Sequence, residues 1–341
     1  MRDFLSPAPD LSGASILVTG GTGSFGHAFI AAAAERYKPR KLIVYSRDEM
    51  KQYEMAERFA QERYPFLRYF IGDVRDRDRL EMAMRDVDVV IHAAALKHVP
   101  AAEYNPFECI HTNVMGAENV VRSALRAGVK RVVALSTDKA ANPVNLYGAS
   151  KLASDKIFVA ANSLAGGDGT RFSVVRYGNV VGSRGSVLPF FRRLLANDAK
   201  SLPITDPRMT RFWITLGQGV DFVLSSLKLM RGGEIFVPKI PSMKMVDLAS
   251  AIAPGLAHEI VGIRPGEKLH EVMITSDDAR NTLELADRYV IAPAFPFWTR
   301  DHLDLNGAAK VADEFRYASD SNSEWLTAES LGRMLKSAGF G

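Results

Sequence analysis

Two short segments carry the side chains that a redox and proton-transfer site would need. Tyr147 and Lys151 lie four residues apart on a predicted helix and therefore share one face. On that face the lysine charge is expected to lower the tyrosine pKa, so that the phenolate can take a proton from a substrate hydroxyl as hydride leaves. Directly after the predicted strand 131–135 come Thr137, Asp138 and Lys139. Simple alcohol oxidation needs no such acid and amine, so the sequence predicts a further proton-transfer step.

A glycine-rich turn near the N-terminus predicts a dinucleotide site. It follows the apolar strand 16–19 and opens a helix. Glycines permit the tight turn and the close approach of backbone to pyrophosphate, and the helix N-terminus supplies free N–H groups. An ordinary glycine-rich loop is the alternative, which the flanking strand and helix disfavour. The predicted contacts in this turn are Gly20, Thr22, Gly23, Ser24, Phe25 and Gly26.

The end of the second predicted strand, 41–45, distinguishes NADP from NAD. NAD-specific folds usually place an acid here to bind the ribose hydroxyls. Ser46, Arg47 and Lys51 are instead suited to hold a 2′-phosphate. Asp48 stands later than the usual acid and is suited to cap its helix. The sequence therefore favours NADP.

Further cofactor contacts are expected after the third and fourth strands. Asp73 and Val74 follow the third strand, where an adenine ring would lie. Ala93 would let the backbone pass close to the cofactor, and Lys97 would point into the cleft. A plain turn residue remains the alternative for Asp73, and a surface lysine the alternative for Lys97.

Composition and charge exclude several classes of protein. The 341 residues carry 43 basic and 39 acidic side chains, and the net charge of +4 includes no basic run suited to nucleic acid. No metal site is predicted. The single cysteine, Cys109, excludes an internal disulfide framework and fits a reducing compartment. No stretch approaches the roughly 20 apolar residues of a membrane span. We therefore expect a cytoplasmic protein.

The order of apolar segments predicts the fold class. Apolar strands regularly separated by helices predict an α/β protein with a Rossmann-like, doubly wound parallel sheet. After residue 177 the alternation weakens, and glycine, proline and arginine become prominent. We therefore expect a dinucleotide-binding domain over 1–177 and a smaller, loop-rich substrate lobe over 178–341. A segment near 211–240 is expected to return to the first sheet.

Taken together, these motifs resemble a known protein family. The glycine turn and the Tyr147/Lys151 pair resemble the extended short-chain dehydrogenases/reductases. Longer strings are similar to the inverting UDP-N-acetylglucosamine 4,6-dehydratases, the first enzymes of pseudaminic acid synthesis. The resemblance extends from about residue 16 to residue 325. The strings span residues 135–143, 145–151, 176–186, 207–213, 236–244 and 264–271.

The resemblance implies a mechanism. Tyr147, helped by Lys151, would deprotonate the hydroxyl on sugar carbon 4 while tightly bound NADP takes the hydride. Lys139 would then remove the carbon 5 proton, with Asp138 and Lys139 as candidates for protonating the water that leaves carbon 6. Thr137 would hydrogen-bond near the carbon 4 oxygen. Hydride returns to carbon 6, so the cofactor is recycled each turnover, and reprotonation from the other face inverts carbon 5. A lysine base needs a depressed pKa, which burial or the cations Lys97 and Lys151 would provide.

The resemblance also implies substrate contacts and an assembly. The implied substrate is UDP-N-acetylglucosamine, and a homo-oligomer, either a dimer or a hexamer, is expected. A retaining 4,6-dehydratase or a UDP-sugar 4-epimerase is the alternative within enzymes; a cofactor-sensing binding protein would be expected to lose Tyr147 or Lys151. The implied substrate contacts are Lys97, Asn179, Arg184, Thr210, Arg211, Arg264, Glu267, Glu314 and Tyr317.

Overall fold

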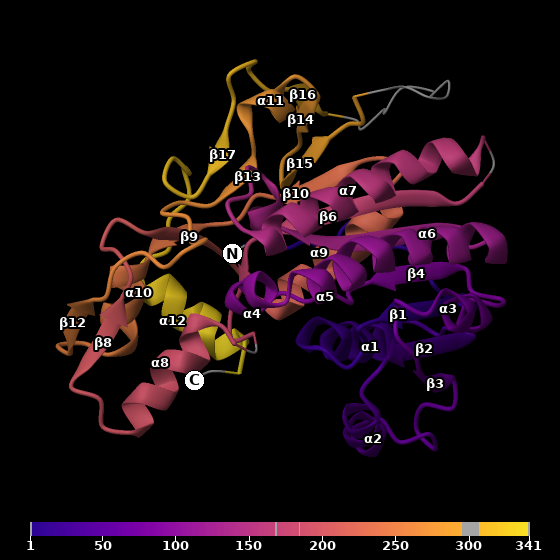
Figure 1. Ribbon diagram of the computed structural model, residues 1–341, viewed down its shortest axis with the longest axis horizontal. Helices are drawn as coiled ribbons and strands as arrows, with labels where there is room; N and C mark the ends of the chain where they lie inside the picture. The colour runs from indigo at the N-terminus through magenta and orange to yellow at the C-terminus, as the bar shows by residue number, and fades with distance from the viewer. Residues whose placement is uncertain (1, 168, 184, 295–306, 340–341) are drawn as a thin grey trace.

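A mainly parallel sheet forms the centre of the protein (Figure 1). The computed structural model describes residues 2–167, 169–183, 185–294 and 307–339. Within these residues the sheet has ten strands in the order β16-β14-β15-β10-β6-β5-β4-β1-β2-β3. The predicted α/β class with a doubly wound parallel sheet is therefore confirmed.

The parallel part of the sheet has the strand order that creates a binding crevice. Its apolar strands are buried on both faces, as parallel strands between helices must be. The order reverses between β1 and β4, and ligands bind at the carboxyl ends of strands at such a reversal. The parallel strands are β1 (Ser15–Thr19), β2 (Lys41–Ser46), β3 (Leu67–Ile71), β4 (Val89–His92), β5 (Arg131–Thr137), β6 (Arg171–Tyr177) and β10 (Ile235–Pro238).

Helices connect and cover these strands. Helix α1 packs against α9, whereas α6 packs against both α3 and α7. The Asp48 and Asp76 side chains cap α2 and α3 by accepting bonds from backbone N–H groups, which are left unpaired at helix N-termini. The helices are α1 (Ser24–Arg36), α2 (Glu49–Arg58), α3 (Arg77–Ala83), α4 (Val99–Tyr104), α5 (Pro106–Ile110), α6 (Gly116–Ala127), α7 (Leu146–Ala165) and α9 (Leu216–Leu229).

Helices α5 and α6 are joined by a π-helical turn, His111–Met115. Asn113 in this turn is buried, and its amide bonds both the N–H and the C=O of Leu96 at 2.8 and 2.9 Å. The same amide donates to the Ser150 hydroxyl of α7 at 2.9 Å. The π turn thus fixes the loop after β4 at the crevice, which fits the frequent location of π turns at functional sites.

The C-terminal part of the chain contributes strands to the central sheet and to the smaller sheets outside it. Segment α9–β10 returns to the central sheet, and β14 (Thr282–Glu284), β15 (Arg288–Ile291) and β16 (Ala309–Lys310) extend its edge in antiparallel fashion. The boundary at residue 177 between two domains stays a prediction. The remaining elements are the turn Asp138–Ala140, β7 (Asn179–Val180), α8 (Val187–Ala196), β8 (Ser201–Ile204), β9 (Thr210–Ile214), β11 (Ser242–Lys244), α10 (Met245–Ile252), β12 (Ala257–Ile260), β13 (Val272–Ile274), α11 (Ser276–Ala279), β17 (Tyr317–Ala318) and α12 (Ala328–Ser337).

The N-terminal arm, to which the sequence assigned no role, is packed against α9. Phe4 is fully buried and meets Phe222 edge to face, with ring centroids 5.1 Å apart. The Arg2 carbonyl accepts a bond from Gln218 at 2.9 Å, and the Arg2 guanidinium pairs with Glu324. The arm therefore links the returning helix to the C-terminal segment.

We expect Phe4→Ala to lower the free energy of unfolding by about 3–5 kcal/mol, because it leaves a cavity in a closed core. Urea denaturation followed by circular dichroism measures this change. Leu5→Ala is the control, since Leu5 is 48% exposed and its truncation should cost about 0.5 kcal/mol or less. Equal losses in the two variants would contradict the packing role of the arm.

Candidate active site

The glycine turn is held in close contact with the loop after β4. Gly20 has φ +66°, which favours glycine, and an added Cβ would lie 2.8 Å from the Ala94 backbone. A Cβ on Gly26 would lie 2.2 Å from the Gly21 carbonyl oxygen. The turn therefore exposes bare backbone beside the N-terminus of α1, a geometry suited to a pyrophosphate.

A cavity of about 670 Å³ opens at this point and runs along the carboxyl ends of the strands. Every residue predicted to bind the cofactor lines it: the glycine-turn residues, Ser46, Arg47, Asp48, Lys51, Asp73, Val74, Ala93, Lys97, Tyr147 and Lys151. Thr137, Lys139 and Asn179 line the same cavity. One space therefore joins the dinucleotide cradle to the side chains expected to perform proton transfer, and its residues fit a nicotinamide dinucleotide.

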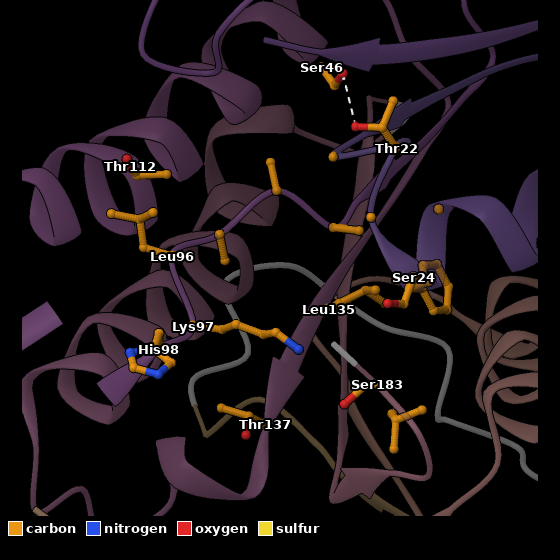
Figure 2. A pocket seen from close by; sticks show the side chains of 18 of the residues that line it. Thr22, Ser24, Ser46, Leu96, Lys97, His98, Thr112, Leu135, Thr137 and Ser183 are labelled. Carbon is orange, nitrogen blue, oxygen red and sulfur yellow. Dashed lines mark hydrogen bonds between the residues drawn. The ribbon is translucent and has the colours of Figure 1, made fainter. Parts of the chain in front are cut away.

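At the β2 end of the cavity, two cations and two carboxylates line the wall. The Asp48 carboxylate caps α2 and pairs with Lys51 at 2.5 Å, while Arg47 lies 3.8 Å from Asp73. The Thr22 hydroxyl donates to the Ser46 hydroxyl at 3.1 Å (Figure 2). Arg47 and Lys51 remain about half exposed at the cavity wall. Their charges can therefore reach an anion placed there.

At the other end the side chains are buried and their pKa values are shifted. Burial raises the pKa of Tyr147 to about 12, against the opposing effects of the Lys139 charge and a Thr137 hydrogen bond. Burial lowers the pKa of Lys151. Lys139 is thus the nearby cation that favours the tyrosinate. Lys151 lines the same cavity as Tyr147, and its assistance to the tyrosine stays a prediction.

Lys97 approaches the same region from the loop after β4. Its amine extends across the cavity toward Leu135 and Ser183 (Figure 2). Burial, and then the charge of Lys139, lower its pKa. An amine with a lowered pKa inside a cavity is typical of a functional group rather than of a surface lysine.

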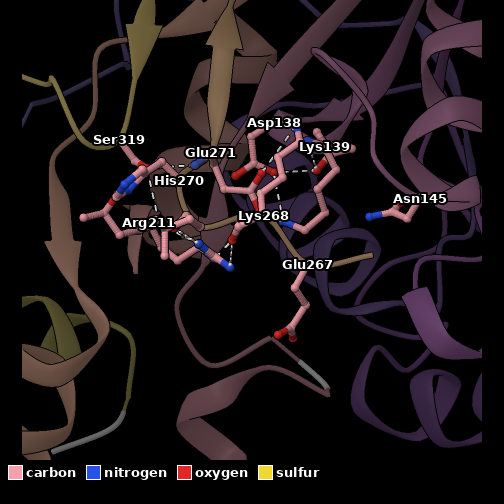
Figure 3. Close-up of polar contacts among 12 residues, drawn as sticks. Asp138, Lys139, Asn145, Arg211, Glu267, Lys268, His270, Glu271 and Ser319 are labelled. Carbon is pink, nitrogen blue, oxygen red and sulfur yellow. Dashed lines mark hydrogen bonds and ion pairs between the residues drawn. The ribbon is translucent and has the colours of Figure 1, made fainter. Parts of the chain in front are cut away.

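Lys139 itself has a raised pKa, which corrects the expectation of a depressed one. Its Nζ lies 3.1 Å from Asp138 Oδ1 and 3.0 Å from Glu271 Oε1 (Figure 3). Burial alone would lower the lysine pKa, but the two carboxylates outweigh burial and hold it above its usual range. Lys97 and Lys151 do not compensate for them. Lys139 is therefore an ammonium in this arrangement.

The predicted substrate residues fall into different environments. The Thr210 hydroxyl bonds Ser319 and His270 at 2.7 and 2.8 Å, and the buried Arg211 guanidinium donates to backbone carbonyl groups. The Tyr317 hydroxyl is buried and bonded to Ile240. These three side chains are engaged within the protein, and their substrate contacts stay predictions.

The remaining predicted contacts lie closer to solvent. Arg264 and Glu267 face each other at 4.0 Å in an exposed loop, and the Asn145 side chain donates to the neighbouring Gly266 carbonyl at 2.7 Å. Glu314 is exposed on a turn. Arg184 lies outside the described residues.

Glu271 and Lys268 are among the buried charges near the cavity that the sequence did not single out, as are Asp155 and Arg176. The first two lie in the 264–271 string, but their spacing from Lys139 in the chain gives no indication of contact. Within the part of the chain that the structure describes, no helix has the length and apolar composition of a membrane span, and no cluster of side chains suits a metal ion.

Comparison with known proteins agrees with this geometry. Residues 16–293 match the model of a family described as polysaccharide biosynthesis protein. A protein of Campylobacter jejuni subsp. jejuni serotype O:2 called UDP-N-acetylglucosamine 4,6-dehydratase (inverting) is 61% identical, over 93% of this chain and 96% of its own length. The chain belongs to this family of inverting dehydratases. A Rickettsia bellii protein called UDP-glucose 4-epimerase is 41% identical over 94% of this chain and 95% of its own.

Solved structures show the same fold. The structure of Pen from Bacillus thuringiensis superposes with a TM-score of 0.88 at 34% identity, covering 97% of this chain and 99% of that one. DesIV of Streptomyces venezuelae, a dTDP-glucose 4,6-dehydratase solved with NAD and TYD bound, superposes with a TM-score of 0.65 at 26% identity. It covers 75% of this chain and 86% of that one.

We expect Gly26→Ala to weaken binding of a nicotinamide dinucleotide at least about tenfold, equivalent to about 1.4 kcal/mol, because the new methyl group displaces the Gly21 carbonyl. Isothermal titration calorimetry measures the affinity. Gly219→Ala in α9 is the control, since nothing lies within 4 Å of its added Cβ and alanine favours the helix. Unchanged affinity in Gly26→Ala would contradict the cradle assigned to this turn.

Proposed function

We propose that the protein dehydrates UDP-N-acetylglucosamine across sugar carbons 4 to 6 with inversion at carbon 5. The product is UDP-2-acetamido-2,6-dideoxy-β-L-arabino-hex-4-ulose, the first intermediate of pseudaminic acid synthesis. The observation that carries this proposal is the meeting of Tyr147 and Lys139 at one end of a dinucleotide cavity, with the buried Asp138 bonded to Lys139, in a chain 61% identical to an inverting dehydratase. A cytoplasmic location and a homo-oligomer belong to the same proposal.

Each side chain has one task in this reaction. Tyr147 takes the proton of the carbon 4 hydroxyl, and the Lys139 charge beside it favours the phenolate. A nicotinamide dinucleotide bound in the cavity would accept the hydride from carbon 4 and return it to carbon 6. The ketone at carbon 4 acidifies the carbon 5 proton, which Lys139 removes as the neutral amine, after its own proton has passed to Asp138 along the hydrogen bond between them. Asp138 supplies the proton with which water leaves carbon 6. After hydride addition, carbon 5 takes up a solvent proton on its opposite face, which balances the proton that Tyr147 releases.

The position of Asp138 suits the role of an acid. Its side chain is fully buried and accepts bonds from the Thr137 hydroxyl and the Lys139 amine at one oxygen, Oδ1. Burial raises its pKa although the Lys139 charge opposes that shift. A carboxyl group with a raised pKa accepts a proton from the Lys139 ammonium more readily and can pass it on to the leaving group.

A UDP-sugar 4-epimerase is the second candidate, favoured by the 41% identity with the Rickettsia protein of that name. An epimerase oxidises and re-reduces carbon 4 without loss of water. It would need Tyr147 but not the buried acid and amine beside it. The position of Lys139 at the cavity wall, paired with the buried Asp138, therefore favours dehydration.

Proton NMR of UDP-N-acetylglucosamine incubated with the enzyme in deuterated water tests the reaction. We expect a new carbon 6 methyl signal, deuterium at carbon 5 and L-arabino couplings. Lys139→Ala should abolish carbon 5 exchange while NADP still binds. Retained D-xylo couplings would identify a retaining dehydratase, and a galacto isomer without a methyl signal would identify an epimerase.

NADP is the proposed cofactor because Arg47 and Lys51 stand at the cavity wall near Ser46. We expect Arg47→Ala to weaken NADP binding about tenfold, the loss of one charge-assisted contact, and to leave NAD binding within about twofold. Calorimetry with both cofactors measures the ratio. Arg58→Ala is the control, because Arg58 stands at the far end of helix α2, which begins just after Arg47, and does not line the cavity. An equal loss for both cofactors would contradict a 2′-phosphate contact.

A further inference from the structure

Glu271 approaches the catalytic turn from a distant part of the chain. It directly precedes β13 and is 1% exposed. Its backbone is fixed by Ser319, whose hydroxyl accepts from the Glu271 N–H at 2.9 Å and whose N–H donates to the Glu271 carbonyl at 2.8 Å. The side chain therefore starts from a rigid backbone.

The Glu271 carboxylate shares the Lys139 amine with Asp138. Its Oε1 lies 3.0 Å from Nζ, and Asp138 Oδ1 lies 3.1 Å from the same nitrogen (Figure 3). Both carboxylates keep one buried oxygen, Oε2 or Oδ2, without a hydrogen-bond partner. A lysine used only as a salt-bridge partner would need one carboxylate, so the second one calls for an explanation.

Two further cations, Arg211 and Lys268, lie close to the Glu271 carboxylate. Arg211 Nε lies 3.7 Å from Oε1, and Lys268 Nζ lies 3.9 Å from Oε2. Lys268 also donates to the Ala141 carbonyl at 2.5 Å, directly after the turn that carries Lys139. Burial alone would raise the pKa of Glu271, but Lys139, Arg211 and Lys268 outweigh burial and lower it. Glu271 is therefore the permanent anion of the cluster.

Ionisable side chains from several parts of the chain therefore surround Lys139. Asp138 belongs to its own turn, and Tyr147 faces it from α7. Lys97 reaches toward it from the loop after β4. The groups acting on it from the C-terminal half are Glu271, Arg211 and Lys268.

We propose that Glu271 is a positioning residue for Lys139: it holds the amine at the cavity wall and determines, against Asp138, when that amine is free to accept a proton. The inference rests on the dehydration proposed above for the chemical step. The contacts between Glu271 and Lys139 do not depend on that proposal.

The proposed elimination changes the protonation of both Lys139 and Asp138. In the elimination the C5–H bond breaks and an N–H bond forms on Lys139, while Asp138 protonates the carbon 6 oxygen and water leaves with the C–O electron pair. The step ends with a Lys139 ammonium and an Asp138 carboxylate. Transfer of one proton from Nζ to Oδ1 across 3.1 Å restores both groups for the next turnover.

Glu271 acts on this balance because it remains charged throughout. It stabilises the ammonium that forms when the carbon 5 proton is taken. Its charge also lowers the fraction of Lys139 that is present as the neutral amine before that step. Removing its charge should therefore make Lys139 easier to deprotonate and harder to position.

Competitive labelling with trace acetic anhydride, read by mass spectrometry from pH 6 to pH 12, measures the Lys139 amine without any substrate. In Glu271→Gln we expect the labelling midpoint of Lys139 to fall by about one to three pH units, because one opposite charge at contact distance is removed. An unchanged midpoint would overturn the proposal, whether or not the proposed reaction is correct.

The pH profile of turnover supplies the second readout. In Glu271→Gln the acid limb of kcat should move to lower pH by at least about one unit, and the maximum should fall because the amine is less well held. Equal loss of kcat at every pH would indicate a merely structural role and overturn the proposal. Absence of product from wild-type enzyme would refute the proposed function while the labelling result still decides the role of Glu271.

Two further variants serve as comparisons for Glu271→Gln. Glu284→Gln is the matched control, since Glu284 also pairs with a lysine, Lys239, at 2.7 Å but stands in β14 away from the cavity. It should leave the Lys139 midpoint unchanged. Glu271→Asp keeps the charge and shortens the side chain, so it should shift the midpoint in the same direction by less than Glu271→Gln. If Glu271→Gln does not fold, a Glu271→Asp midpoint equal to wild type overturns the proposal.

Discussion

All strands of the parallel sheet end at one edge, and the reversal of their order between β1 and β4 opens that edge. The close approach of Gly20 to Ala94 shows how little space separates the two connections at the reversal. Every other feature of the site depends on this constraint. The glycine turn, the β2 cations and the turn after β5 all follow strand ends, so they meet in one cavity although they are far apart in the chain.

Burial then decides the chemistry inside that cavity. A charge removed from water needs a partner, and the low dielectric strengthens each interaction that remains. Asp138, Lys139 and Glu271 satisfy this requirement only as a group, with Arg211 and Lys268 behind them. The same burial raises the pKa values of Asp138 and Tyr147, both of which exchange protons in the proposed reaction. Stability and protonation are therefore set by one network of contacts.

Much of the site could be predicted because it depends on local spacing. Tyr147 and Lys151 share a helix face by periodicity, and the glycine turn needs only a strand before it and a helix after it. Asp48 caps its helix as expected, for the same local reason. The π turn at Asn113 was not predictable, since it follows from tertiary hydrogen bonds to Leu96 and Ser150 rather than from any local preference.

The sequence by itself determined the class of fold, the dinucleotide cradle and the presence of an acid and an amine after the fifth strand. Only the tertiary structure decided the charge state of that amine. Burial and neighbouring cations suggested a depressed Lys139 pKa, but Asp138 beside it and Glu271, more than a hundred residues away, both contact the amine and together reverse the direction. A pKa reflects the sum of all nearby charges and of desolvation. Those terms are fixed by contacts between distant segments, which spacing along the chain does not reveal.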